Sequence, residues 1–264
     1  MNYNLLTQLQ IVLVLLGAPF FAFLDSPWLE QYFPHGQDIT NVIMISFYSW
    51  TFLTAKRRLH WLVLLMTITS LCAEIMGSKI LILYEYHLKN IPIYIPLGHA
   101  VIYATVFQIS RQPLVWQHHV AIEKFLHKFA FITCFMSLFI LKDVAGFMCY
   151  MVFLVIMSQR TKPLFYLCMF AVTYYIELCG TTLAAWSYYF VLGNHPNYPP
   201  TSITPSGIAG VYIIVDLTCN SAYFYIKKFK KYFKNLGNTP TSTIKKTDAS
   251  LWPMQAPLTE KINN

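Results

Sequence analysis

The chain has 264 residues, of which 56% are hydrophobic and only 11% are charged. Soluble globular domains carry about 25% charged residues, so this composition excludes a disordered chain, a coiled coil and an ordinary cytosolic enzyme. The net charge of +8 would suit nucleic acid only if the basic residues shared one folded domain. They are instead spread between apolar segments, so we expect an all-α membrane protein and no nucleic-acid partner.

Eight apolar segments follow one another along the chain, and a membrane-spanning helix needs about 20 such residues. The predicted spans are 5–24, 39–55, 61–83, 91–109, 120–141, 144–158, 164–192 and 207–226. We expect them to form an eight-span transmembrane helix bundle within residues 1–234. Residues 235–264 are polar and rich in Ser, Thr and Pro, so they are predicted to be a disordered cytoplasmic tail.

The basic residues indicate the orientation of these spans. Every Lys and Arg except Lys79, Lys89 and Lys142 lies in or beside a loop that follows an even-numbered span, or in the tail. Cytoplasmic loops carry an excess of Lys and Arg. The pattern therefore predicts that both termini are cytoplasmic, in a bacterial inner membrane or plasma membrane.

An internal repeat links the third and seventh segments, because five pairs of residues recur at one constant spacing. The pairs are Glu74 with Glu177, Gly77 with Gly180, Ser78 with Thr181, Tyr86 with Tyr189, and Pro96 with Pro199. Four spans separate the copies, which suggests a parallel four-plus-four duplication of the kind found in some transporter folds. Chance recurrence in an apolar chain is the alternative.

Three carboxylic acids lie well inside the predicted spans, apart from Glu123 in the amphipathic first turns of span 120–141. An ionisable side chain inside a span costs at least ~2.5 kcal/mol on insertion scales. Glu177, Glu74 and Asp216 are therefore the candidate catalytic residues. We expect Glu177 to donate a proton, with Glu74 or Asp216 as its partner, because a carboxyl in a low-dielectric pocket tends to keep its proton. Such an acid could protonate an alkene or an ether. Lys79 lies near the end of its span and is expected to reach outward to the interface.

Tyrosine and tryptophan crowd the outer ends of the same spans, at the depth of one histidine. The candidate substrate-binding residues are His99, Tyr84, Tyr86, Trp186, Tyr188 and Tyr189. Aromatic faces stabilise a developing positive charge, which would suit an isoprenoid-like substrate. The alternative is an aromatic belt at the membrane interface.

The sequence predicts no metal site and no cofactor. The six cysteines lie in apolar segments without a C-x-x-C pair, as expected for free thiols in a packed interior. Membrane di-iron enzymes bind their metal through repeated histidine boxes. The sequence around His118, His119 and His127 does not contain such boxes. There is no P-loop and no dinucleotide fingerprint. The proline-rich loop 193–207 is interpreted as either a rigid cap or a plain connector.

The stretch that contains Glu74, Gly77, Tyr84-Glu85-Tyr86 and Ile95-Pro96-Leu97 resembles part of the motif block of the integral-membrane carotenoid hydratases of carotenoid biosynthesis. Similar blocks occur in uncharacterised bacterial multi-pass membrane proteins. A similar pattern of residues occurs a second time between Glu177 and Pro200. The resemblance implies a substrate pocket that includes Glu74, Tyr84 and Tyr86.

Three hypotheses about function follow. The first is a membrane protein that acts on a lipid-soluble, isoprenoid-like substrate by acid–base chemistry from intramembrane carboxylates. The second is a small proton-coupled carrier that uses the same carboxylates, and the third is a non-catalytic membrane scaffold. The expected partners are membrane lipids and a lipid-soluble small molecule; the sequence names no protein partner.

Overall fold

A computed structural model describes residues 3–55, 57–160 and 163–236. The chain divides into two units, Met1–Tyr223 and Phe224–Asn264. The structure is 76% helical, which confirms the prediction of a mainly helical chain. The tail predicted for residues 235–264 lies, from residue 237 onward, outside the described residues.

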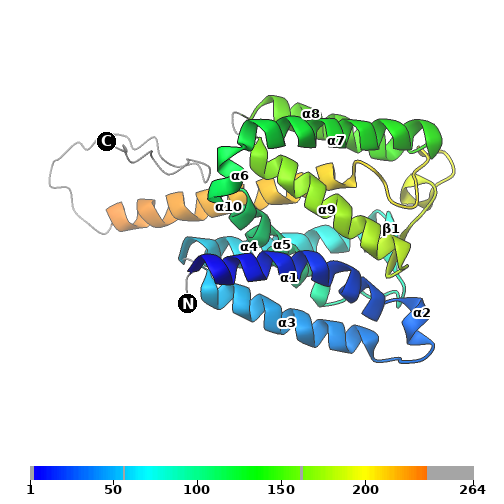
Figure 1. The fold of residues 1–264 in the computed structure, drawn as a ribbon, viewed down its shortest axis with the longest axis horizontal. Helices are drawn as coiled ribbons and strands as arrows, with labels where there is room; N and C mark the ends of the chain where they lie inside the picture. Colours follow the sequence, from blue (N-terminus) through cyan, green and yellow to red (C-terminus); the bar gives the residue numbers. More distant parts are fainter. Residues whose placement is uncertain (1–2, 56, 161–162, 237–264) are drawn as a thin grey trace. The chain divides into compact units, whose positions relative to one another are not determined.

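Within the described residues the chain forms ten α-helices (Figure 1). They are α1 (Tyr3–Leu24), α2 (Pro27–Glu30), α3 (Gly36–Thr54), α4 (Arg57–Glu74), α5 (Tyr94–Ile109), α6 (Pro113–Gln117), α7 (His119–Ile140), α8 (Val144–Ser158), α9 (Leu164–Thr182) and α10 (Ile208–Leu236). The other regular segments are a π-helix over Ile75–Ile80, the strands β1 (Tyr84–Tyr86) and β2 (Trp186–Tyr188), and a 3-10 helix over Leu192–Asn194.

In the part of the chain that the structure describes, four helices are long and apolar enough to cross a membrane. They comprise Leu5–Leu24, Leu59–Ile80, Leu164–Thr182 and Ile208–Lys230. Helices α5 and α8 are apolar but shorter, and α3 and α7 lie at the second and fifth predicted segments. The chain is therefore compatible with membrane integration.

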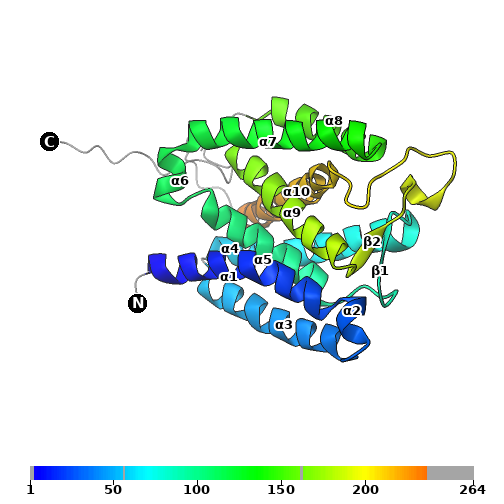
Figure 2. The same ribbon diagram turned by 45° about the vertical axis from the view of Figure 1, so that its right-hand side comes forward.

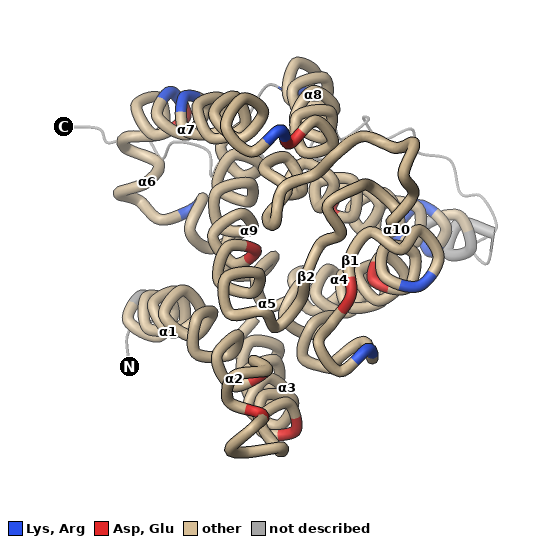
Figure 3. The backbone as a smooth tube through the Cα atoms, turned by 90° about the vertical axis from the view of Figure 1, so that its right-hand side faces the viewer, with Lys and Arg blue, Asp and Glu red and all other residues tan. Residues whose placement is uncertain are grey.

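The surface of the helices fits a lipid environment. Leu53, Leu16 and Phe139 are 80%, 68% and 65% exposed, and a soluble monomer rarely exposes extended apolar surface of this kind. Charged residues are sparse along the described backbone in Figure 3. Inside the first unit, α5 packs against α1, α3, α4 and α9, so α5 occupies a central position.

The third and seventh predicted segments extend too far. The helical structure ends at Ile80 and at Thr182, and the chain then turns through Ile82 and Ala184, whose φ angles are 49° and 56°. Each turn leads into a short strand of aromatic residues. Apolar runs of helix and strand are alike in hydropathy, which explains why the seventh predicted segment included β2 and the third ran past the end of its helix.

The two strands pair antiparallel, with Tyr84 opposite Tyr188 and Tyr86 opposite Trp186. Figure 2 shows the pair beside the end of α9. The outer two residues of each strand are buried and the central residue is exposed, because successive side chains in a strand point to opposite faces. Four aromatic side chains are thereby directed into the interior.

Asp143 anchors the proline-rich loop. Its buried carboxylate accepts hydrogen bonds from the backbone N–H of Gly146 (3.0 Å), Ser202 (3.2 Å) and Ser206 (2.7 Å), and from the Ser137 hydroxyl (3.1 Å). Both oxygens therefore accept from two donors each. The carboxylate joins the start of α8 to the segment that enters α10.

Asp143→Asn should destabilise the protein by about 2–4 kcal/mol, since the new NH2 group would face donors and leave buried N–H groups unpaired. Thermal unfolding of the purified protein in detergent measures this change as a lower Tm. The matched control is Asp38→Asn, because the Asp38 side chain is 76% exposed. Equal Tm values for Asp143→Asn and wild type would contradict the anchoring role.

Candidate functional site

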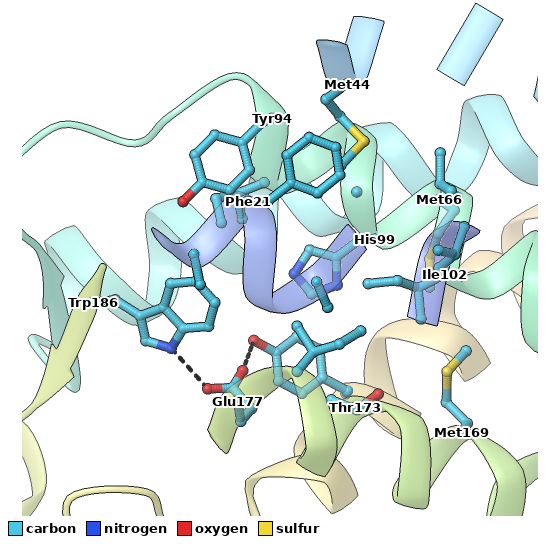
Figure 4. Close-up of a pocket in the computed structure, with 18 of the residues that line it drawn as sticks. Phe21, Met44, Met66, Tyr94, His99, Ile102, Met169, Thr173, Glu177 and Trp186 are labelled. Atoms are coloured by element: carbon cyan, nitrogen blue, oxygen red, sulfur yellow. Dashed lines mark hydrogen bonds between the residues drawn. The ribbon is translucent and has the colours of Figure 1, made fainter. Parts of the chain in front are cut away.

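A cavity of about 100 Å³ lies in the first unit, walled by α1, α3, α4, α5, α9, α10 and the two strands (Figure 4). Its wall is mainly aliphatic and aromatic. The ionisable side chains that line it, apart from tyrosines, are His99, Glu177 and Asp216. An apolar cavity of about 150 Å³ can hold benzene, so this smaller cavity suits a short apolar chain or the end of a larger molecule.

Glu177 is held by three aromatic donors. Trp186 Nε1 donates to Oε2 at 2.9 Å, and the Tyr188 hydroxyl donates to the same oxygen at 3.0 Å. The Tyr212 hydroxyl donates to Oε1 at 2.7 Å. Figure 4 shows the Trp186 indole directed at this carboxylate. Because Glu177 is only 3% exposed, these donors replace the water that the carboxylate has lost.

Glu74 has an equivalent environment. The hydroxyls of Tyr84 and Tyr86 donate to its Oε2 at 2.6 Å and 2.5 Å. His99 Nε2 lies 3.0 Å from Oε1. Glu74 is 2% exposed and does not itself line the cavity, but its three partners do. We call each glutamate with its three partners a carboxylate cage.

The two cages contact each other through their rings. The His99 ring stacks on Tyr212, with centroids 4.8 Å apart and planes at 27°. Tyr84 lies against Tyr188 with centroids 5.2 Å apart. In both cages, one oxygen of the glutamate accepts hydrogen bonds from the two strand residues. The other oxygen is paired with a residue of the next long helix, α5 for Glu74 and α10 for Glu177.

The spacing within the cages differs by one residue. The strand partners follow Glu74 by 10 and 12 positions, and they follow Glu177 by 9 and 11. The π-helix Ile75–Ile80 lies between Glu74 and its partners, and a π-helical turn holds more residues than an α-helical turn. The π-helix therefore accommodates the extra residue.

Glycine makes room for the first strand residue of each cage. A Cβ at Gly77 would lie 2.9 Å from the Tyr84 hydroxyl, and a Cβ at Gly180 would overlap the Trp186 indole. Both glycines come three residues after the glutamate, so the ring packs directly on the helix backbone.

Asp216 differs from both glutamates. It lines the same cavity and is 1% exposed, yet neither carboxylate oxygen has a hydrogen-bond partner. It follows Tyr212 by four residues on α10, so it lies about one helical turn, or 5.4 Å, from the Glu177 cage. An unpaired buried polar group costs free energy, and this cost needs an explanation.

The structure brings most of the predicted site residues together. The hydrogen-bonded cluster contains Glu74, Glu177, His99, Tyr84, Tyr86, Trp186 and Tyr188. Asp216 joins the cavity wall but not the cluster. Tyr189, predicted together with Tyr188, is not among the residues that line the cavity, and its hydroxyl donates to exposed Glu85 at 3.1 Å. Neighbouring residues of an extended segment point to opposite faces, so Tyr188 faces the cavity and Tyr189 does not.

Sequence reasoning missed Tyr212, which completes the Glu177 cage. Its spacing of four residues from Asp216 places both side chains on one helix face, and this pattern could have identified it. The proline-rich loop 193–207 contributes no lining residue to the cavity.

A second polar cluster, also missed, lies beyond the end of α1. Asp25 accepts hydrogen bonds from the Tyr94 hydroxyl at 2.6 Å and from Gln37 Nε2 at 3.0 Å, and His87 Nδ1 is 3.5 Å away. Burial raises the pKa of Asp25, while the Tyr94 hydrogen bond and His87 oppose the rise. The cluster joins α1, α3 and α5 next to the strands.

Within the described residues, no group of three His, Cys, Asp or Glu side chains is placed to hold a metal ion. Comparison of the chain with protein-family models, with curated proteins and with solved structures gave no match. The site must therefore be interpreted from its own geometry.

Gly180→Ala should destabilise the protein by about 1–3 kcal/mol, because the added methyl group would displace the Trp186 indole. Thermal unfolding in detergent measures the effect. The control is Gly98→Ala, whose Cβ would meet Met44 Cε at an ordinary 3.6 Å. Alanine favours helix over glycine, so a Gly180→Ala variant as stable as Gly98→Ala would contradict the packing described for this cage.

Proposed function

We propose that this protein resides in a bacterial inner or plasma membrane and acts on a lipid-soluble small molecule by acid–base chemistry. The observation that carries the proposal is an apolar, aromatic cavity with the buried carboxylates Glu177 and Asp216 in its wall. Placing each acid inside a membrane costs about 2.5 kcal/mol or more of free energy. Helix packing alone does not require an acid at these positions. Intramembrane ionisable residues of this kind mark functional sites.

The aromatic wall supports a reaction that develops positive charge. Tyr188, Tyr212 and Trp186 hold their donors on Glu177, which fixes their rings beside the cavity. Fixed aromatic faces attract a cation most strongly where water is excluded. An isoprenoid-like end group that gains a proton would meet such an environment.

The resemblance to the carotenoid hydratases points in the same direction. It implies a pocket that includes Glu74, Tyr84 and Tyr86, and these three residues form one cage whose tyrosines line the cavity. The volume of about 100 Å³ accommodates the end of a long isoprenoid rather than its full length. The isoprenoid class therefore stays part of the proposal.

We further propose that the two cages are halves of a parallel four-plus-four duplication. A local twofold axis through the Glu85–Ser187 pair relates the two strands. The related residues are Glu74 with Glu177, Gly77 with Gly180, Tyr84 with Trp186, Tyr86 with Tyr188, and His99 with Tyr212. In this proposal α1, α3, α4 and α5 correspond to α7, α8, α9 and α10, and all eight helices cross the membrane.

A proton-coupled carrier is the second candidate, and one observation favours it. Asp216 has no partner on either oxygen, and an intramembrane carboxylate of this kind is typical of ion and proton pathways. A non-catalytic scaffold would not explain the free-energy cost of burying Glu74, Glu177 and Asp216 at the cavity.

The proposed topology is tested with reporters fused at loop positions. Fusions after Arg58, Arg111, Arg160 and Lys234 should report the cytoplasm, and those at Lys89 and Asn197 the external side. The reason is the concentration of Lys and Arg in alternate loops. An external signal at Lys234 would contradict the eight-span arrangement.

The proposed activity is tested by mass spectrometry of membrane lipids from cells with and without the gene. An enzyme should change the mass of a lipid-soluble species, whereas a carrier should change only its distribution. Glu177→Gln keeps the side-chain shape and removes the carboxylate, so the lipid change should disappear while membrane insertion persists. Glu85→Gln, an exposed residue of β1, is the control and should resemble wild type. Full activity in Glu177→Gln would make Glu177 a purely structural residue.

A further inference from the structure

Of the two carboxylates that line the cavity, Asp216 is the one without a hydrogen-bond partner among the described residues. Glu74 and Glu177 each have three partners, whereas both Asp216 oxygens have none. Asn220, one turn further along the same helix, is occupied elsewhere: it donates to the Asp216 backbone oxygen at 2.8 Å and accepts from the Tyr103 hydroxyl at 3.0 Å. A ligand in the cavity is therefore the partner available to this side chain.

The charges around the cavity select the kind of ligand. Two acids, Glu177 and Asp216, line it, and Glu74 lies directly behind its tyrosines. The only basic side chain among the lining residues is His99, which is already engaged with Glu74. Because opposite charges attract strongly where water is excluded, this environment favours a cation and rejects an anion.

The aromatic surroundings reinforce this selection. Tyr212 and Asp216 lie four residues apart on α10, on the same helix face, and both line the cavity. A carboxylate beside aromatic faces is the combination that recognises ammonium groups. A hydroxyl group of a ligand would satisfy only one Asp216 oxygen and would leave the aromatic faces unused.

We infer that Asp216 binds the cationic nitrogen of a small lipophilic amine in the cavity. This inference rests on the proposed function, since it assumes that the lipid-soluble ligand enters this cavity, and it narrows the ligand to one with an ammonium group. The apolar part of the ligand inside the cavity, about the size of a short alkyl chain, lies among the aliphatic and aromatic side chains, and its nitrogen points along α10 toward Asp216.

The test compares three short-chain probes of different charge on the full-length protein in nanodiscs of zwitterionic lipid. The probes are n-butylammonium, n-butanol and butanoate, and binding is measured by calorimetry against empty nanodiscs. Wild type should bind the ammonium most tightly, the alcohol more weakly, and the carboxylate not at all. Asp216→Asn should weaken ammonium binding at least about tenfold, because a buried charge pair is lost, and should leave alcohol binding unchanged.

The matched control is Asp38→Asn, which removes an equal charge from an exposed site and should leave all three affinities unchanged. Asp216→Glu retains the charge and should still prefer the ammonium over the alcohol. Equal binding of ammonium and alcohol by wild type overturns the inference, even if Asp216→Asn fails to fold, while the proposed function survives. If no probe binds, both the inference and a ligand site in this cavity are overturned.

Discussion

A carboxylate in an apolar interior must recover the hydrogen bonds that water would have supplied, and this requirement shapes the centre of the molecule. The backbone N–H groups of the surrounding helices are already used within those helices, so side chains must donate instead. Glu74 and Glu177 obtain their donors from tyrosine, tryptophan and histidine. A residue ten positions along a continuous helix would lie about 15 Å away. The chain therefore has to leave the helix and return, which explains the turns at Ile82 and Ala184.

The same requirement makes the two cages depend on each other. Strands β1 and β2 have three residues each, and a short two-stranded ribbon is marginal by itself. Each strand is held in place by the other, by the hydrogen bonds to a glutamate, and by a ring packed on Gly77 or Gly180. Loss of one cage would therefore also release the donors of the other. The stacked rings of His99 and Tyr212 add a direct contact between the two cages.

Sequence reasoning could predict the approximate positions of the helices and the burial of Glu74, Glu177 and Asp216, because hydropathy and the rarity of charge are local properties. It could not predict the ends at Ile80 and Thr182, since an apolar strand continues an apolar helix without a change in hydropathy. The repeat in the sequence pairs Tyr86 with Tyr189, whereas Tyr188 is the residue that binds Glu177 as Tyr86 binds Glu74. The constant spacing in the sequence ignores the extra residue of the π-helix, and one residue reverses a strand face. Tyr212 escaped notice because a tyrosine in an apolar helix resembles an ordinary packing residue.

The proposed correspondence between the cages also predicts which residue is the counterpart of Asp216. If His99 corresponds to Tyr212, the residue one turn further along α5 is Tyr103, and its counterpart on α10 is Asp216. Tyr103 is buried and donates its hydroxyl to Asn220, whereas Asp216 is an acid without a partner. In the proposed duplication, the two halves are therefore similar where the glutamates are satisfied and different one helical turn further along. Symmetric features are sufficient to build the scaffold, but a ligand that is not itself symmetric needs an asymmetric contact. The open carboxylate lies at the position where the two halves diverge, which is where specificity for such a ligand can arise.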